Sequence, residues 1–253
     1  MPATDLDLLL DAARAAADIA LPAQHRDLEV TDKGDGQGPV TDADLAVDAM
    51  LRETLLAARP GYGWLSEETP DDTARLACEH VFVVDPIDGT RSYIAGSKDW
   101  AHSLAVVRNG AVTAAVVHLP ARGLVYAATA GGGATLNGAR IRVSTSGVTP
   151  TVLANKRSFA SPRWRYPPDA TRAFRSSLAW RLALVAEGRF DAMLTLDRAW
   201  EWDVAAGALL VAEAGGTVTD AGGAPPVFNA PAARTDGLVA AGPDAHAALM
   251  AAL

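Results

Sequence analysis

Val81-Phe82-Val83-Val84-Asp85-Pro86-Ile87-Asp88-Gly89-Thr90 is the most informative stretch of this 253-residue chain. Its first four residues favour a buried β-strand, and Pro86, which has no N–H for a sheet ladder, predicts that the strand stops there. Asp85 and Asp88 then lie at the end of a rigid strand, Gly89 lets the backbone approach a ligand, and Thr90 offers a hydroxyl and an N–H. Two carboxylates 4 Å apart repel by about 4 kcal/mol at an effective dielectric of about 20, so the pattern favours a bound cation over a simple Asx-type turn.

Two further acidic clusters lie elsewhere in the chain. Glu67-Glu68 follows a short apolar segment, and Trp200-Glu201-Trp202-Asp203 precedes an alanine-rich stretch that ends at Gly215-Gly216. Taken alone, Asp203 also fits the N-cap of a helix that begins at Val204. Carboxylates from three separate segments, with no Cys/His cluster beside them, favour magnesium over zinc.

These motifs together carry a family resemblance. They are Glu67-Glu68, Asp85-Pro86-Ile87-Asp88-Gly89-Thr90, Trp202-Asp203-Val204-Ala205-Ala206 with Glu213-Ala214-Gly215-Gly216, and, upstream, Lys33 with Gly38-Pro39-Val40-Thr41-Asp42-Ala43-Asp44. In this order the chain resembles the inositol monophosphatase superfamily of magnesium-dependent, lithium-sensitive phosphatases. The resemblance runs from about residue 5 to the C-terminus.

The resemblance implies a role for each motif residue. It implies that Glu67, Asp85 and the Ile87 carbonyl bind one Mg²⁺, and that Asp85, Asp88 and Asp203 bind a second. Glu67, Thr90 and Asp44 are the implied catalytic residues, and Lys33 and Glu68 would support the ligands or help to hold a third ion. For Lys33 and Asp44, a solvated loop or helix surface is the alternative interpretation. The implied substrate contacts are Asp88, Gly89, Thr90, Arg91, Ser176, Ser177 and Asp197.

The residues after the hexapeptide bear on the substrate. Inositol monophosphatases usually continue with Thr-Asn-Phe, whereas this chain has Arg91-Ser92-Tyr93. A basic residue here looks more like the 3′(2′),5′-bisphosphate nucleotidases, which favours removal of the 3′-phosphate from adenosine 3′,5′-bisphosphate. Inositol-1-monophosphatase and histidinol-phosphatase are the enzymatic alternatives, and a regulatory protein that binds transcription machinery is the non-enzymatic one. Arg91 itself could meet a second phosphate or pair with Asp99.

Composition sets bounds on partners and location. The formal net charge is −8, which argues against a surface that coats nucleic acid, so we expect a small phosphorylated substrate and no nucleic-acid polymer. Cys78 is the only cysteine, which fits a reducing compartment. The N-terminus has no basic targeting region, and no apolar run approaches membrane-spanning length, so a cytoplasmic protein without a membrane partner is expected. The family resemblance also implies a homodimer.

Periodicity predicts an α/β protein in two halves. Residues 1–148 should form an α+β half with an antiparallel sheet and most metal ligands, and residues 149–253 an α/β half with a mixed sheet. The resemblance implies a layered αβαβα sandwich of the sugar-phosphatase type, with the active site between the halves. The expected helices are 6–20 (before Pro22), 42–58, 172–187 and the one after Asp203; the expected strands are 81–84, 102–108, 111–119, 124–128, 152–154 and 190–196, with loops at 31–39 and 158–169 and a hairpin turn at Asn109-Gly110.

Overall fold

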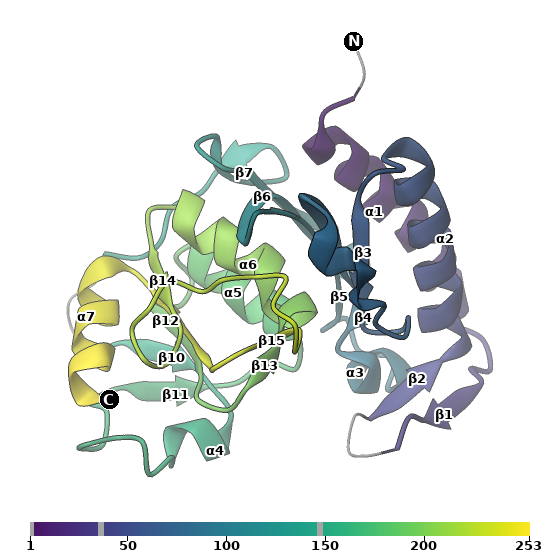
Figure 1. Ribbon diagram of the computed structural model, residues 1–253. Helices are drawn as coiled ribbons and strands as arrows, with labels where there is room; N and C mark the ends of the chain where they lie inside the picture. Colours follow the sequence, from purple (N-terminus) through teal and green to yellow (C-terminus); the bar gives the residue numbers. More distant parts are fainter. Residues whose placement is uncertain (1–2, 35–37, 146–148) are drawn as a thin grey trace.

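Helices and sheets alternate in five layers in a computed structural model of the chain, which describes residues 3–34, 38–145 and 149–253 (Figure 1). The order is α1 with α2, a seven-stranded sheet, α5 with α6, a five-stranded sheet, and α7 on the outside. The helices are α1 (Asp5–Ala23), α2 (Asp42–Ala58), α3 (Thr90–Ile94), α4 (Lys156–Phe159), α5 (Leu178–Ala186), α6 (Glu201–Glu213) and α7 (Pro243–Ala252), with 3₁₀ turns at Thr73–Ala77 and Pro120–Arg122. The predicted αβαβα sandwich is therefore confirmed.

The first sheet is antiparallel except at one edge, where β3 and β4 run parallel. Its strands, in spatial order, are β3 (Gly63–Ser66), β4 (His80–Asp88), β5 (Ala101–Arg108), β6 (Ala111–Leu119), β7 (Leu124–Thr129), β8 (Gly133–Leu136) and β9 (Ala139–Arg140). Asn109 and Gly110 both have positive φ, 48° and 84°, as the predicted hairpin turn requires.

The second sheet is mixed, as predicted, because β10 runs parallel to β11 and β12 whereas β16 is antiparallel to β12 and β14. Its order is β11 (Thr171–Ala173), β10 (Thr151–Leu153), β12 (Ala192–Thr195), β16 (Leu238–Ala241) and β14 (Thr217–Thr219). Two small ribbons complete the fold: β1 (Val30–Asp32) with β2 (Pro39–Thr41), and β13 (Ala199–Trp200) with β15 (Arg234–Thr235). The expected loop at 31–39 thus contributes its ends to a hairpin, and residues 35–37 lie outside the described part.

Local sequence signals account for the first two helices. Thr4 with Asp7, and Thr41 with Asp44, form reciprocal capping boxes at the starts of α1 and α2. The prediction that α1 ends before Pro22 is wrong, since Pro22 lies inside its last turn. The missing N–H there leaves only the carbonyl of the exposed Asp18 without its helical partner, and water can serve that group.

The prediction that Pro86 stops its strand is also wrong. β4 continues to Asp88, and the ladder with β5 shifts between the pairs Asp85–Ser103 and Asp88–Ala101. Two residues of β4, Pro86 and Ile87, therefore face one residue of β5, His102. A bulge of this kind is where a residue without an N–H is tolerated. The buried His102 ring hydrogen-bonds the Pro86 carbonyl through Nδ1. Burial lowers the pKa of His102 to about 3, so the ring is neutral and Nδ1 carries the donated proton.

Two predicted helix boundaries in the second half need correction. Residues 172–187 are not one helix: Thr171–Ala173 form β11, and α5 starts after Ser177, whose hydroxyl accepts the Trp180 N–H as an N-cap. Asp203 is not an N-cap either, because α6 begins at Glu201 after Trp200. Asp203 lies in the first turn of α6, so its carboxylate is not used to cap the helix.

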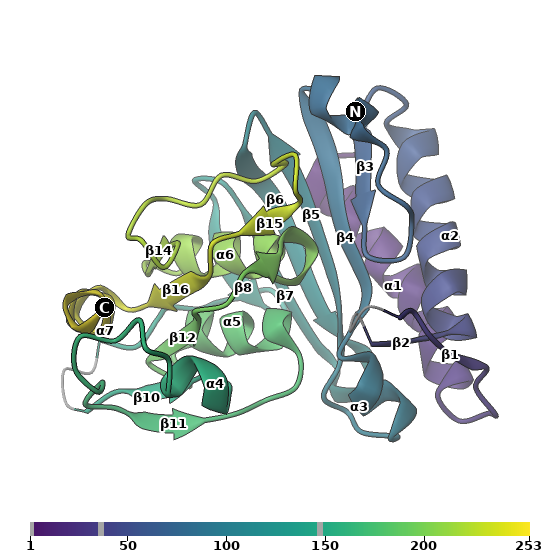
Figure 2. The same cartoon turned by 60° about the horizontal axis from the view of Figure 1, so that its bottom comes forward.

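Helices α5 and α6 form the layer between the two sheets (Figure 2). They pack tightly at Gly207 of α6, where an added Cβ would lie 2.4 Å from Cβ of Leu182. A side chain of any size at this position would push the two helices apart. Within the described residues, no helix is both long and apolar enough to cross a membrane.

This contact yields a stability test. Gly207→Ala should destabilise the protein by up to about 2 kcal/mol, because overpacking costs about 1–3 kcal/mol and the better helix propensity of alanine offsets roughly 1 kcal/mol of that cost. Thermal unfolding measures the change, with Gly61→Ala as the control because nothing lies within 4 Å of its added Cβ. Equal melting temperatures for the two variants would contradict the packing described here.

Candidate active site

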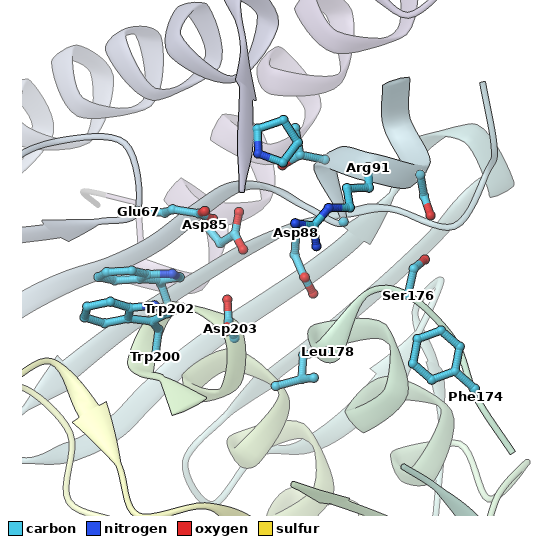
Figure 3. Close-up of a pocket in the computed structure, with 14 residues that line it drawn as sticks. Glu67, Asp85, Asp88, Arg91, Phe174, Ser176, Leu178, Trp200, Trp202 and Asp203 are labelled. Atoms are coloured by element: carbon cyan, nitrogen blue, oxygen red, sulfur yellow. The ribbon is translucent and has the colours of Figure 1, made fainter. Parts of the chain in front are cut away.

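A cavity of about 480 Å³ lies where the end of β4 meets the N-terminal ends of α5 and α6 (Figure 3). Polar and apolar side chains from both halves of the chain line it. They are Pro39, Glu67, Asp85, Asp88, Gly89, Thr90, Arg91, Ser92, Phe174, Ser176, Leu178, Trp200, Trp202 and Asp203. Most of the motif residues singled out in the sequence therefore meet in one place.

Three carboxylates converge in this cavity. Glu67 follows β3, Asp85 lies in β4 and Asp203 in the first turn of α6, and one oxygen of each lies within 4.8 Å of the others. Asp85 is 1% exposed, and neither of its carboxylate oxygens has a hydrogen-bond partner within the described residues. Burial, followed by the charges of Glu67 and Asp88, raises the pKa of Asp85 well above its ordinary value. Hard oxygen donors with unmet bonding capacity fit Mg²⁺.

Asp88 is held differently. Its Oδ2 accepts hydrogen bonds of 2.6 Å from both the Ser177 hydroxyl and the Ala179 N–H at the start of α5. Burial raises the pKa of Asp88 to about 6, while these hydrogen bonds and the nearby Arg181 act in the opposite direction. Asp88 is thus fixed by the second half of the chain through one oxygen, and Oδ1 is left for a ligand.

Lys33 links the two adjacent glutamates. Its Nζ lies 2.7 Å from Oε1 of Glu67 and 2.7 Å from Oε1 of Glu68. Burial opposes the charge of Lys33, but the two carboxylates outweigh it and raise the lysine pKa. Burial, followed by the charge of Glu67, raises the pKa of Glu68 to about 7. The solvated-loop interpretation of Lys33 is wrong, because its side chain is only 12% exposed.

Asp44 and Thr90 form a second polar pair beside the acidic cluster. The Thr90 hydroxyl lies 3.3 Å from Oδ1 of Asp44 and 3.2 Å from the Ile87 carbonyl. Oδ2 of Asp44 accepts the N–H and the hydroxyl of Thr41. Burial raises the pKa of Asp44 despite those hydrogen bonds, so the helix-surface interpretation is wrong for this buried residue.

The pairing of Arg91 with Asp99 is also wrong, since Asp99 forms its ion pair with Arg122. Arg91 lines the cavity, with one guanidinium nitrogen 3.3 Å from the position of a Cβ added to Gly38. Within residues 3–34, 38–145 and 149–253, it makes no ion pair. Its guanidinium therefore lines the cavity without a carboxylate partner among these residues.

Three of the expected substrate residues, Ser176, Ser177 and Asp197, lie in three different environments. Ser176 lines the cavity and donates its hydroxyl to the Asp99 carbonyl, whereas Ser177 is fully buried and serves Asp88. Asp197 does not belong to this site: it pairs with Arg157 and lines a separate surface pocket. Both Ser176 and Asp197 were assigned to the site by their position in the chain, and α5 and β12 lie between them.

The sequence analysis did not predict the aromatic residues that line the cavity, which are Trp200, Trp202 and Phe174. Trp200 and Trp202 stack with centroids 4.5 Å apart, and the Arg234 guanidinium lies 3.6 Å from the Trp200 ring centroid. Phe174 was assigned to a helix face, although the Ser176-Ser177 pair, with its preference for N-caps, signals a helix that starts later. These residues line the two ends of the cavity, with the carboxylates between them (Figure 3).

The five-layer α/β fold is shared with solved structures. The structure of extragenic suppressor protein suhB from Bartonella henselae superposes with a TM-score of 0.86 at 28% identity, covering 97% of this chain and 96% of that one. The family model described as "Inositol monophosphatase family" matches residues 3–253. The chain belongs to the inositol monophosphatase family, whose members include phosphomonoesterases.

Three similar relatives carry different names. An inositol-1-monophosphatase of Rhizobium meliloti is 37% identical, with 78% of this chain and 77% of the relative covered. The Nus factor SuhB of Pseudomonas aeruginosa is 33% identical, with 85% and 84% covered. A histidinol-phosphatase of Mycobacterium tuberculosis is 34% identical, with 84% and 85% covered. None of these three names is that of a bisphosphate nucleotidase.

The unpaired Asp85 carboxylate predicts a link between metal and stability. A carboxyl whose native pKa is raised weakens the fold as pH rises above its unfolded pKa, because the native state binds more protons. At pH 8 with a chelator, Asp85→Asn should therefore melt at a higher temperature than the unchanged protein. Adding Mg²⁺ should raise the melting temperature of the unchanged protein and have less effect on the variant.

Asp197→Asn is the matched control for this comparison, since Asp197 lies outside the cavity. It should keep the full Mg²⁺-dependent shift. The interpretation of Asp85 as a cation ligand fails if Asp85→Asn shows the same Mg²⁺ shift as Asp197→Asn.

Proposed function

We propose that this chain is a magnesium-dependent phosphomonoesterase that acts on a small phosphorylated metabolite. The observation that carries the proposal is the buried Asp85 carboxylate, unpaired and placed beside Glu67 and Asp203. A folded protein without a cation would have to desolvate these like charges with no compensation. Membership of the inositol monophosphatase family supports the same reaction class.

Two sets of oxygen donors would hold the ions. Glu67, Asp85 and the Ile87 carbonyl form one, and Asp85, Asp88 and Asp203 form the other; Lys33 and Glu68 hold Glu67 in place and border the position of a third ion. Bound Mg²⁺ supplies positive charge that offsets the phosphate and the developing charge of the displacement. Asp88 contributes through its free oxygen, since Oδ2 is occupied by Ser177 and Ala179.

The protein's own groups would handle the proton of the attacking water. Thr90 contacts Asp44, and the raised pKa of Asp44 makes that carboxylate a stronger base than an exposed aspartate. We propose that the Thr90 hydroxyl orients the water together with Glu67, and that Asp44 accepts the proton through Thr90. The backbone N–H groups of Gly89 and Thr90 would contact phosphate oxygens.

Asp88→Asn tests the charge requirement. The asparagine oxygen can still accept from Ser177 and Ala179, so the fold should be retained while one negative charge is lost. Turnover should fall on the order of several hundredfold at saturating substrate, because a preorganised charge at the reacting group is removed. Phosphate release is the assay, with loss of activity in a chelator and recovery with Mg²⁺ as the parallel measurement. Near-normal turnover of Asp88→Asn would refute the role given to Asp88.

We propose that the substrate is adenosine 3′,5′-bisphosphate, because of the position of Arg91. Its guanidinium lines the cavity next to Thr90 and is not paired with Asp99. A guanidinium fork favours a second phosphate on the substrate. Inositol 1-phosphate and histidinol phosphate are the alternatives, and the names of the relatives from Rhizobium meliloti and Mycobacterium tuberculosis support them.

Arg91→Ala separates these substrates. KM for adenosine 3′,5′-bisphosphate should rise roughly ten- to a hundredfold, as expected for the loss of a charge-assisted contact, while hydrolysis of inositol 1-phosphate should barely change. Arg108→Ala, which removes an exposed arginine paired with Glu79, is the control. Equal losses on both substrates would make Arg91 a structural residue and remove the argument for a bisphosphate.

A transcription-related binding role is the second candidate, supported by the relative named Nus factor SuhB. Magnesium-dependent phosphate release by the purified protein, measured on a panel of adenosine 3′,5′-bisphosphate, inositol 1-phosphate, histidinol phosphate and fructose 1,6-bisphosphate, distinguishes the enzyme from a binder without activity. Direct measurements of nucleic-acid binding test our expectation that the chain contacts no nucleic-acid polymer. The homodimer, the cytoplasmic location and lithium inhibition stay predictions.

A further inference from the structure

Phe174 is an apolar side chain exposed at the rim of the candidate active site. The residue is 49% exposed, and among the exposed large apolar residues in the described part of the chain it is the one that lines the cavity of about 480 Å³. It lies across the carboxylates from the tryptophan pair (Figure 3). A large apolar surface left open inside a polar pocket is typical of a ligand contact.

The ring of Phe174 is backed by a buried cation. The Arg181 guanidinium lies 4.5 Å from its ring centroid, and Arg181 is only 4% exposed. Nε of Arg181 donates to the Arg175 carbonyl at 2.5 Å, and Nη2 donates to the Ser176 carbonyl at 3.3 Å. These bonds fix the backbone directly after Phe174. The loop that carries the ring is therefore held in place.

The tryptophans at the other end of the cavity do not offer an open face. Trp200 is covered on one side by Trp202, at an interplanar angle of 14°, and the Arg234 guanidinium lies against its ring as well. Trp202 is itself buried. An aromatic group of a substrate would therefore stack on Phe174.

The charge behind the ring restricts what can stack on it. Aromatic faces attract cations, and Arg181 already occupies one face of Phe174. A second cation on the opposite face would be repelled by the first, whereas a neutral planar ring gains offset stacking and apolar burial. A polyol presents no flat face and would leave the ring exposed.

We propose that the alcohol portion of the substrate carries a neutral planar ring, which stacks on Phe174 while the phosphate lies at the carboxylates. This inference rests on the proposed phosphatase function and narrows its substrate class. A purine nucleoside phosphate and a phosphate ester with an uncharged imidazole share this chemistry. Inositol phosphates and other polyol phosphates do not.

Phe174→Leu and Phe174→Trp test the proposal with four substrates at pH 8 and fixed Mg²⁺. Adenosine 3′,5′-bisphosphate and histidinol phosphate carry planar rings, and inositol 1-phosphate and glycerol 2-phosphate do not. Phe174→Leu should lower kcat/KM for ring-bearing substrates by roughly two- to twelvefold, the range expected for one aromatic contact, and change the other two by less than twofold. Phe174→Trp should restore the ring-bearing substrates, and Val227→Ala, an exposed apolar change away from the cavity, should alter none.

The two ring-bearing substrates also identify the source of the ring. Loss on the adenosine compound alone assigns a purine, and loss on histidinol phosphate alone assigns an imidazole; either supports the proposal. Equal loss on all four substrates, or no loss on any, overturns it.

Failure of the proposed function gives a different result. If the unchanged protein releases no phosphate from any of the four, the phosphatase assignment fails and the stacking is decided by calorimetric binding of adenosine 3′,5′-bisphosphate. Weaker binding to Phe174→Leu than to the unchanged protein then supports the ring contact. Equal binding, or no binding to either, overturns it.

Discussion

The buried carboxylate of Asp85 is the constraint on which the rest of this structure depends. It lies in the buried part of β4, its oxygens have no hydrogen-bond partner within the described residues, and Glu67 and Asp203 are close by. Desolvating one such charge is unfavourable by several kcal/mol, and neighbouring charges of the same sign add to the penalty. A bound cation turns the same arrangement into a favourable one. The surrounding secondary structure supplies the apolar burial that offsets the penalty in the protein without a cation.

The bulge at Pro86 explains how one strand can present both of its aspartates to the same cavity. Asp85 and Asp88 are three positions apart, and residues separated by an odd number point to opposite faces of a regular strand. The extra residue between the ladder pairs removes this conflict, and both side chains line the cavity. The neutral His102 holds the Pro86 carbonyl at the bulge, and the start of α5 holds Asp88 from the other side. The geometry is thus set by backbone irregularity and by contacts between distant segments.

The dependence of the site on contacts between distant segments explains what could and could not be predicted from the sequence. The five-layer fold, the first two helices and the meeting of Glu67, Asp85, Asp88, Thr90 and Asp203 follow from caps, periodicity and motif spacing, which are local signals or come from the family resemblance. The predicted end of the strand at Pro86 was wrong because a bulge depends on the partner strand. The N-cap alternative for Asp203 fails because α6 begins two residues earlier, at Glu201, whose N–H donates to the Ala233 carbonyl of a distant segment. Asp197 was placed in the site by its position in the chain alone. Phe174 was hidden by a helical pattern that covers a strand, a loop and a helix.

Arg181 connects the charged end of the cavity to its aromatic end. Burial lowers the pKa of Arg181 to about 10, and the charges of Asp88 and Asp203 oppose that change, so the side chain stays charged at neutral pH. The same guanidinium holds the carbonyls of the 175–176 loop and lies behind Phe174. A residue at this position therefore moderates the negative charge around the carboxylates and also fixes the surface that meets the substrate. For the proposed enzyme, substrate preference and metal affinity would consequently not be independent, because altering the loop would disturb Arg181, which both ends of the cavity share.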